Sequence, residues 1–160
     1  MKAQLKLDKA LRFEGTDSKG HQTFFDTSVE GGGLGTAAGP MDTALEAAAA
    51  CSAMDIIPIL HKKRKTVEGF TVDLTAERAE TPPRVFTAIE MDFRLVSADA
   101  TAKDLASAVE LSHTKYCSVT IMLARSGCKV SWKSTVVNSQ TGLTETITSQ
   151  EWRQQSLVKG

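Results

Sequence analysis

Hydrophobic and polar residues alternate over the first part of the chain. Leu5 and Leu7 are flanked by polar residues, and a second short extended run covers residues 21–26, after a polar turn at residues 15–20. Alternation with a period of two places one set of side chains on one face of a β-strand. The pattern therefore predicts that the chain opens with an antiparallel pair of strands.

A helix rich in small residues follows. Residues 31–39 are mostly Gly and Ala, which predicts a mobile loop, and Pro40 can occupy the first turn of a helix. Residues that recur at steps of three and four along this helix are Leu45, Ala48, Ala49, Ser52, Ile56 and Leu60. Their neighbours are mainly Ala, so the helix presents little bulk and is suited to burial against another element. Pro58 lacks an amide donor, which predicts a kink or an early end.

The rest of the chain alternates between strand and helix patterns. Residues 67–77 and 85–95 have period two and enclose the turn Thr81-Pro82-Pro83, which predicts a long antiparallel hairpin. Then follow a predicted helix from about Thr101, a helix from near Cys117 to Gly127, a strand at 128–137 and a weak strand at 143–147. This order indicates one α+β domain over residues 1–160. A single thin sheet would leave the Ala-rich helix partly uncovered, which suggests a dimer.

The amino-acid composition limits the kinds of molecule that the protein is expected to bind. The 160 residues are enough for one ordinary domain, and nineteen Lys and Arg balance nineteen Asp and Glu. No net field would attract nucleic acid or an anionic membrane, so neither is expected as a partner. No uninterrupted apolar run reaches the length of a membrane span, and residues 1–4 lack the apolar core of a signal peptide. We therefore expect a cytoplasmic protein whose cysteines rest as thiols.

The three cysteines have different surroundings. Cys51 lies within the Ala-rich helix, where a cysteine is most often a small apolar filler. Cys117 lies where a polar stretch with His113 and Lys115 gives way to a helix, and the unpaired amides and dipole of a helix start stabilise a thiolate. A packed residue at a helix start is the alternative interpretation. Cys128 begins a strand and is expected in the core.

Other chemistries fit the sequence less well. The cysteine spacing does not resemble a zinc site or a thioredoxin motif, and the three histidines are scattered, so neither a metal nor another cofactor is expected. A cysteine hydrolase would need a histidine base, for which His113 is the candidate near a thiol, and we rank it below redox chemistry. The glycines at 31–35 lack the Gly-Lys-Ser/Thr ending of a phosphate-binding loop and indicate a flexible connector.

Several segments together resemble a known family. They are Gly39-Pro40-Met41-Asp42, Cys51-Ser52-Ala53-Met54-Asp55-Ile56, the stretches Glu77-Arg78 and Pro83-Arg84-Val85-Phe86-Thr87, Ala108-Val109-Glu110-Leu111-Ser112, and Lys115-Tyr116-Cys117-Ser118-Val119. In their order and in the two cysteine contexts they resemble the OsmC family, and within it the YhfA-like branch. The resemblance runs from about Ala3 to about Val137 and leaves the tail at 138–160 uncovered.

The resemblance implies both an assembly and a chemistry. It implies an intertwined homodimer in which antiparallel sheets wrap around a pair of central helices, with two sites at the subunit interface. It further implies that Cys51 attacks an organic hydroperoxide, that Cys117 resolves the resulting sulfenic acid as a disulfide, and that an external dithiol reduces this disulfide. Apolar residues such as Met54 and Ile56 would favour organic peroxides over hydrogen peroxide.

One departure from the family pattern affects the expected activation of Cys51. Family peroxidases have Pro-Glu at the start of the first-cysteine helix, and the Glu orients an Arg that holds the thiolate. Here Met41 follows Pro40, so Asp42 is the expected substitute, and Arg12 is the only arginine before the helix. The alternative function is a dimeric binding protein that has the same fold and an apolar interface pocket, with weakly activated cysteines.

Overall fold

The computed structural model describes residues 1–157, and the predicted tail therefore lies partly outside the described residues. The chain divides into two compact units, Met1–Glu46 and a second that begins at Ala47. The helix α1 (Pro40–Lys62) contributes residues to both. Each unit is described by itself, and the single domain over residues 1–160 stays a prediction.

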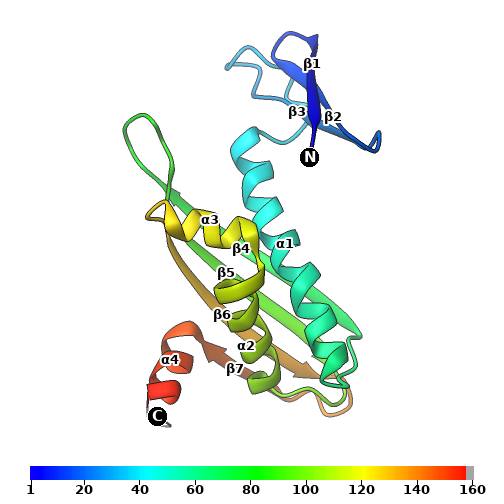
Figure 1. Cartoon of the computed structure of the whole chain (residues 1–160), viewed down its shortest axis with the longest axis vertical. Coiled ribbons are helices and arrows are strands. Elements are labelled where there is room, and N and C mark those ends of the chain that lie inside the picture. The colour runs from blue at the N-terminus through cyan, green and yellow to red at the C-terminus, as the bar shows by residue number, and fades with distance from the viewer. Residues whose placement is uncertain (158–160) are drawn as a thin grey trace. The chain divides into compact units, whose positions relative to one another are not determined.

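The first unit contains a three-stranded antiparallel sheet (Figure 1). Its strands are β1 (Ala3–Lys9), β2 (Arg12–Asp17) and β3 (Gln22–Phe25), in the order β1-β2-β3. The prediction of a strand pair was wrong in that it missed β2 and placed a turn from residue 15. Phe13 pairs with both Leu7 and Phe25, so β2 is the central strand. Its polar composition hid it, because only pairing on both sides stabilises it as a strand.

The loop before α1 is held by one buried carboxylate. Asp26 accepts hydrogen bonds from the backbone N–H groups of Leu34 (3.1 Å) and Thr36 (2.9 Å). These bonds, with that of Thr36 foremost, hold the pKa of Asp26 at about 2. A Cβ at Gly33 would lie 2.5 Å from the Asp26 carboxylate, so this position requires glycine. The Gly- and Ala-rich segment is thus a loop, as predicted. The hydrogen bonds to Asp26 restrain it, which the sequence did not indicate.

Of the two outcomes predicted for Pro58, a kink or an early end, the early end was wrong, because the helix α1 runs through Pro58 to Lys62. Pro58 and Met54, the residue one turn before it, are both exposed. Water can therefore satisfy the Met54 carbonyl that loses its amide partner, which makes the proline tolerable at this position.

α1 is also long and apolar enough to cross a membrane, judged by its length and composition alone. Acidic residues interrupt the apolar run of α1, so the sequence pattern did not predict this. Core helices of proteins that lie outside membranes can meet the same criterion of length and composition. In the second unit this helix buries one face, consisting of Ala48, Ser52, Ile56 and Leu60.

The second unit is built on a four-stranded sheet in the order β4-β5-β6-β7 (Figure 1). Its strands are β4 (Gly69–Arg78), β5 (Phe86–Ser97), β6 (Lys129–Asn138) and β7 (Thr144–Thr148). The predicted hairpin is confirmed as the antiparallel pair β4–β5. β5 and β6 are parallel, and the connection between them consists of α2 (Ala102–Leu111), the π-helical turn η1 (Ser112–Tyr116) and α3 (Ser118–Arg125).

The core of the second unit lies between this sheet and its helices. β5 alternates so that one face is buried, and the side chains on it include Ile89, Met91, Phe93 and Leu95, each at most 1% exposed. The helices contribute further fully buried residues, namely Ile56 and Leu60 from α1 and Leu105 and Val109 from α2. Burial of this apolar area stabilises the unit. It also brings the middle of α1 beside the α2–η1–α3 connection, where the cysteines lie.

The tail contains one element that was not predicted. β7 matches the expected weak strand, but it is followed by the helix α4 (Ser149–Leu157). Glu151 accepts hydrogen bonds from the backbone N–H and the hydroxyl of Thr148, both at 2.8 Å, and its own N–H donates to the Thr148 hydroxyl at 3.2 Å. This reciprocal pair starts the helix, although the sequence after it is mainly polar.

Candidate active site

The structure brings two of the three cysteines together. Cys51 lies in the middle of α1, and Cys117 is the residue immediately before α3. The two thiol groups lie close to each other, and the Cys51 thiol also lies near the backbone N–H of Val119 in the first turn of α3. Both sulfurs therefore lie at the N-terminus of α3. All three cysteines are free thiols, and Cys128 lies elsewhere, with its thiol 4.0 Å from the Lys129 carbonyl oxygen.

The surroundings of Cys51 act against its ionisation. Burial raises the pKa of this thiol, and the contact with Cys117 and the negative charge of Asp55 raise it further, whereas the N–H of Val119 lowers it. Cys51 keeps part of its surface exposed. Within the second unit, Cys51 is thus accessible to a reagent, and a thiolate there needs an additional positive charge.

Cys117 is fully buried and surrounded by hydrogen-bonding groups. The hydroxyl of Ser52 donates to its sulfur at 3.3 Å, and the backbone N–H of Thr120 donates at 3.4 Å. The Cys117 thiol in turn donates to the Thr120 hydroxyl at 3.0 Å. The backbone of Cys117 is fixed by its N–H bond to the Ser112 carbonyl at 2.8 Å, which closes the π-helical turn.

Ser52 joins this cluster to a histidine. Its hydroxyl lies 3.2 Å from the Nε2 atom of His113 and 3.2 Å from the Thr120 hydroxyl. The imidazole ring packs edge-on against Phe93, with 5.6 Å between the ring centroids. Burial lowers the pKa of His113 to about 4, so the ring is neutral at pH 7. The sequence places His113 near a thiol, but its pattern gives no role to Ser52 or Thr120. The sequence does offer one indication of a role for Ser52, because this hydroxyl falls on the face of α1 that is buried.

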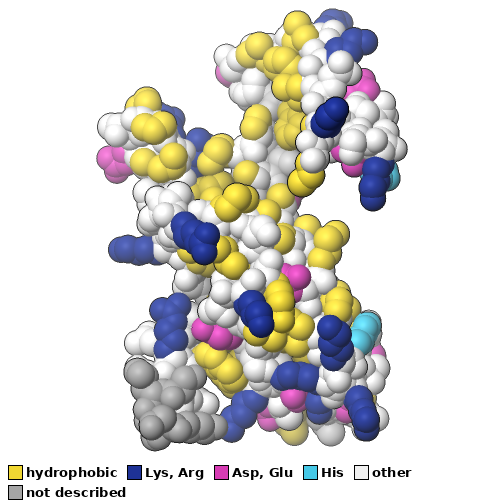
Figure 2. All heavy atoms as spheres, in the orientation of Figure 1, with side chains coloured by type: hydrophobic (Ala, Val, Ile, Leu, Met, Phe, Trp, Pro, Cys, Tyr) yellow, Lys and Arg dark blue, Asp and Glu magenta, His cyan; other side chains and the backbone are white. Residues whose placement is uncertain are grey.

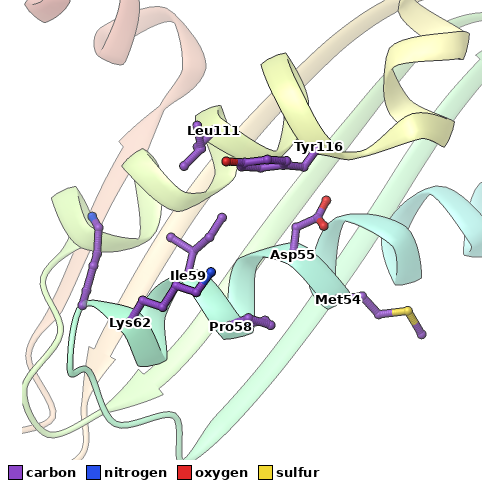
Figure 3. A pocket seen from close by; sticks show the side chains of 8 residues that line it. Met54, Asp55, Pro58, Ile59, Lys62, Leu111 and Tyr116 are labelled. Atoms are coloured by element: carbon purple, nitrogen blue, oxygen red, sulfur yellow. The ribbon is translucent and has the colours of Figure 1, made fainter.

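A pocket of about 350 Å³ lies between α1 and the α2–η1 segment (Figure 3). It is lined by Met54, Asp55, Pro58, Ile59, Lys62, Lys63, Leu111 and Tyr116. Asp55 connects the pocket to the cysteines, since its charge acts on Cys51 and its carboxylate accepts a hydrogen bond from Ser112 at 3.0 Å. Of the two apolar residues expected beside the site, Met54 lines this pocket, whereas Ile56 is fully buried in the core and cannot contact a ligand.

The other two predicted site residues lie in the unit Met1–Glu46. The guanidinium of Arg12 pairs with Asp8 and lies 4.4 Å from the centre of the Phe24 ring. Asp42 accepts a hydrogen bond from the backbone N–H of Gly39 at 3.2 Å, which helps to start α1. The roles of Arg12 and Asp42 in activating Cys51 stay predictions.

The fold and the thiol pair together define a class of α+β protein with one cysteine on a core helix and a second at the start of another helix. Comparison with known proteins identifies the family. Residues 31–133 match the family model described as OsmC-like protein. The chain is 41% identical to Protein YhfA of Escherichia coli strain K12 over 125 residues, which are 78% of this chain and 90% of that protein. The chain therefore belongs to the OsmC-like family, which confirms the resemblance found in the sequence.

Solved structures agree with this assignment. A hypothetical protein from Aquifex aeolicus VF5 is 30% identical, with a TM-score of 0.71 over 84% of this chain and 96% of that one. An organic hydroperoxide resistance protein OsmC from Legionella pneumophila is 17% identical, with a TM-score of 0.59 over 85% of this chain and 96% of that one. At this identity the second likeness shows the fold alone.

The burial of His113 predicts that acid destabilises the protein. The pKa of this histidine falls from 6.5 to about 4 on folding. Its contribution to stability is therefore fully present above pH 6.5 and is lost as the pH falls from 6.5 towards 4, to a maximum of roughly 3 kcal/mol. The free energy of unfolding by urea, measured between pH 7 and pH 4, should fall less steeply in His113→Phe than in the parent.

The matched control for this prediction is His61→Gln, which replaces an exposed histidine near the end of α1. Its stability should fall with acid as steeply as that of the parent. Parallel curves for the parent and His113→Phe would show that His113 is protonated equally in both states.

Proposed function

We propose that this protein is a thiol-dependent peroxidase that reduces organic hydroperoxides. The observation that carries the proposal is the proximity of Cys51 and Cys117 at the N-terminus of α3. A pair of neighbouring thiols, one partly exposed and one buried, suits a cycle in which the first is oxidised and the second forms a disulfide with it. Membership of the OsmC-like family supports the proposal, as does the name of the Legionella pneumophila relative, an organic hydroperoxide resistance protein.

The proposed cycle begins with the Cys51 thiolate. Its sulfur attacks the terminal oxygen of the hydroperoxide, the O–O bond breaks, and the alcohol leaves with a proton, so that Cys51 becomes a sulfenic acid. The Cys117 thiol then attacks the Cys51 sulfur, and water leaves as the disulfide forms. An external dithiol reduces the disulfide and returns both cysteines to thiols. The protein needs no metal or organic cofactor for these steps.

The pocket beside α1 supports the choice of an organic peroxide. Met54, Pro58, Ile59 and Leu111 give it apolar walls (Figure 3), and Asp55, which also lines it, acts on the Cys51 thiol through its charge. An alkyl chain held there would gain the free energy of apolar burial, which hydrogen peroxide cannot. The lysines at 62 and 63 add a cationic edge to the same pocket.

Activation of Cys51 requires a cation, because burial and Asp55 both raise the pKa of this thiol. We assign this role to Arg12, oriented by Asp42. A guanidinium beside the sulfur would stabilise the thiolate and donate a hydrogen bond to the peroxide. The raised pKa is also the observation that favours the alternative, a dimeric binding protein with the OsmC fold. A Cys51 pKa measured at or above the value of free cysteine, about 8.5, would favour that alternative.

We further propose that the protein is an obligate homodimer. In the first unit the exposed large apolar side chains include Leu5, Leu7, Leu11, Phe24, Val29 and Leu34. Figure 2 shows hydrophobic side chains gathered on the visible surface of this unit. Exposed apolar surface of this kind is typical of a protein–protein interface. A second copy of the chain, as the family resemblance implies, would cover it.

The first prediction from this proposal concerns the cysteines. Cys51→Ser should lose peroxide reduction, because serine cannot form a sulfenic acid. Cys117→Ser should still react once with peroxide but keep its sulfenic acid, and Cys128→Ser should turn over like the parent. Peroxide consumption with dithiothreitol and peptide mapping after mild peroxide treatment measure these outcomes. A bridge between Cys117 and Cys128 in the parent would refute the assignment.

The second prediction concerns the dimer. Sedimentation at micromolar concentration should give twice the chain mass of 17.2 kDa. Leu5→Glu should weaken the association, because it places a charge on an exposed apolar surface of β1. Lys6→Glu, on the opposite face of the same strand, is the matched control and should remain dimeric. A folded parent monomer of 17.2 kDa would contradict the proposal.

The third prediction concerns the activating pair. Arg12→Ala should slow the oxidation of Cys51 by peroxide roughly 10²-fold, the usual effect of removing one hydrogen-bond donor from a transition state. Asp42→Asn should slow it less while leaving the dimer intact, because Asn also stabilises a helix start. Stopped-flow oxidation measured across pH would show the thiol pKa moving up in both variants. If both react as fast as the parent, another cation activates Cys51.

A further inference from the structure

We propose that reduction of the disulfide is directional: the external dithiol attacks the sulfur of Cys51, and Cys117 leaves as a thiolate held by Ser52, Thr120 and the N-terminus of α3. This inference rests on the proposed function, because it assumes the disulfide between Cys51 and Cys117. It assigns His113 as a positioning residue that acts on the leaving sulfur through Ser52.

The direction of attack follows from accessibility. Within one chain Cys51 is partly exposed, whereas Cys117 is fully buried. A thiolate must approach the attacked sulfur along the S–S axis, and the Cys51 side is the one open to solvent. The reductant sulfur bonds to Cys51, the S–S bond breaks, and its electron pair goes to Cys117. The second thiol of the reductant then releases Cys51, and the two cysteines take up the two protons.

The surroundings of the two sulfurs favour the same direction. Cys117 accepts hydrogen bonds from the Ser52 hydroxyl and the Thr120 N–H, and the Thr120 hydroxyl at 3.0 Å can turn to donate a third. The amides at the start of α3 add the positive end of the helix dipole. The negative charge of Asp55, by contrast, acts against a thiolate at Cys51. A better stabilised thiolate leaves faster, so bond breaking is easier when the charge develops on Cys117.

His113 decides where the single proton of the Ser52 hydroxyl points. Nε2 lies 3.2 Å from the Ser52 oxygen, and Cys117 lies 3.3 Å from it on another side. If Nε2 carries the ring proton, it donates to Ser52, and the Ser52 proton is then free to donate to the sulfur. The neutral ring, held edge-on by Phe93, thus orients the donor without adding a charge.

The test uses a disulfide made with diamide, so that it does not require peroxidase activity. Reduction of this disulfide by dithiothreitol should be about tenfold or more slower in Ser52→Ala, as expected for the loss of a hydrogen bond to a charged group. His113→Phe should also be slower, whereas His113→Gln, whose side-chain amide can donate to Ser52, should recover most of the parent rate. A purely structural role for His113 would not give this rescue by glutamine.

Ser134→Ala is the matched control, because it also removes a fully buried hydroxyl, one that donates to the Ile147 carbonyl. It should be reduced at the parent rate. If it slows as much as Ser52→Ala, or if His113→Gln is as slow as His113→Phe, the proposed role of the Ser52–His113 pair is overturned.

Trapping tests the direction itself. The diamide-formed disulfide is treated with 2-mercaptoethanol and quenched with iodoacetamide, and the peptides are mapped. Mercaptoethanol should be found on Cys51 and the alkyl group on Cys117. The reverse distribution, or the failure of diamide to join these two cysteines, overturns the proposal. Correct trapping in a protein that does not consume peroxide would overturn the proposed peroxidase function and leave the direction of reduction intact.

Discussion

The candidate site depends on one buried hydroxyl group. Ser52 lies on the face of α1 that is otherwise apolar, and a polar group in that position destabilises the fold unless it is hydrogen-bonded. Its partners, His113, Cys117 and Thr120, come from η1 and the start of α3. This requirement fixes the rotation of α1 against the connection. Since Cys51 is the residue immediately before Ser52, the same rotation places its thiol beside Cys117.

The two thiols are chemically unequal although they lie close together. Cys51 has an exposed edge and a carboxylate nearby, whereas Cys117 is enclosed by donors. A thiol-based enzyme needs this division, because the same pair must react with an outside oxidant and still be returned to its starting state. The inequality arises from secondary structure: the middle of a helix has no free amides to offer a side chain, and the beginning of a helix has several.

Much of the fold was predictable from local pattern. The β4–β5 hairpin and the Ala-rich helix follow from periodicity, and the family resemblance pointed to Cys51 and Cys117. β2 was missed because its residues become a strand only between two partners. α4 was missed although Thr148 and Glu151 carry the spacing of a helix start. The Ser52 cluster could not be read from the sequence, because hydrogen bonds across 61 to 68 residues depend on tertiary packing.

The parallel pairing of β5 and β6 determines how early in folding Cys51 and Cys117 can approach each other. A parallel pair cannot close through a tight turn, so the chain from Ser97 to Lys129 must first be laid across the sheet. Cys117 lies within this connecting segment. Pairing over such a separation in sequence is slow, because loop-closure entropy is lost before the contacts form. The newly made polypeptide therefore carries two separate thiols, and Cys51 and Cys117 come together only when this slow pairing has formed.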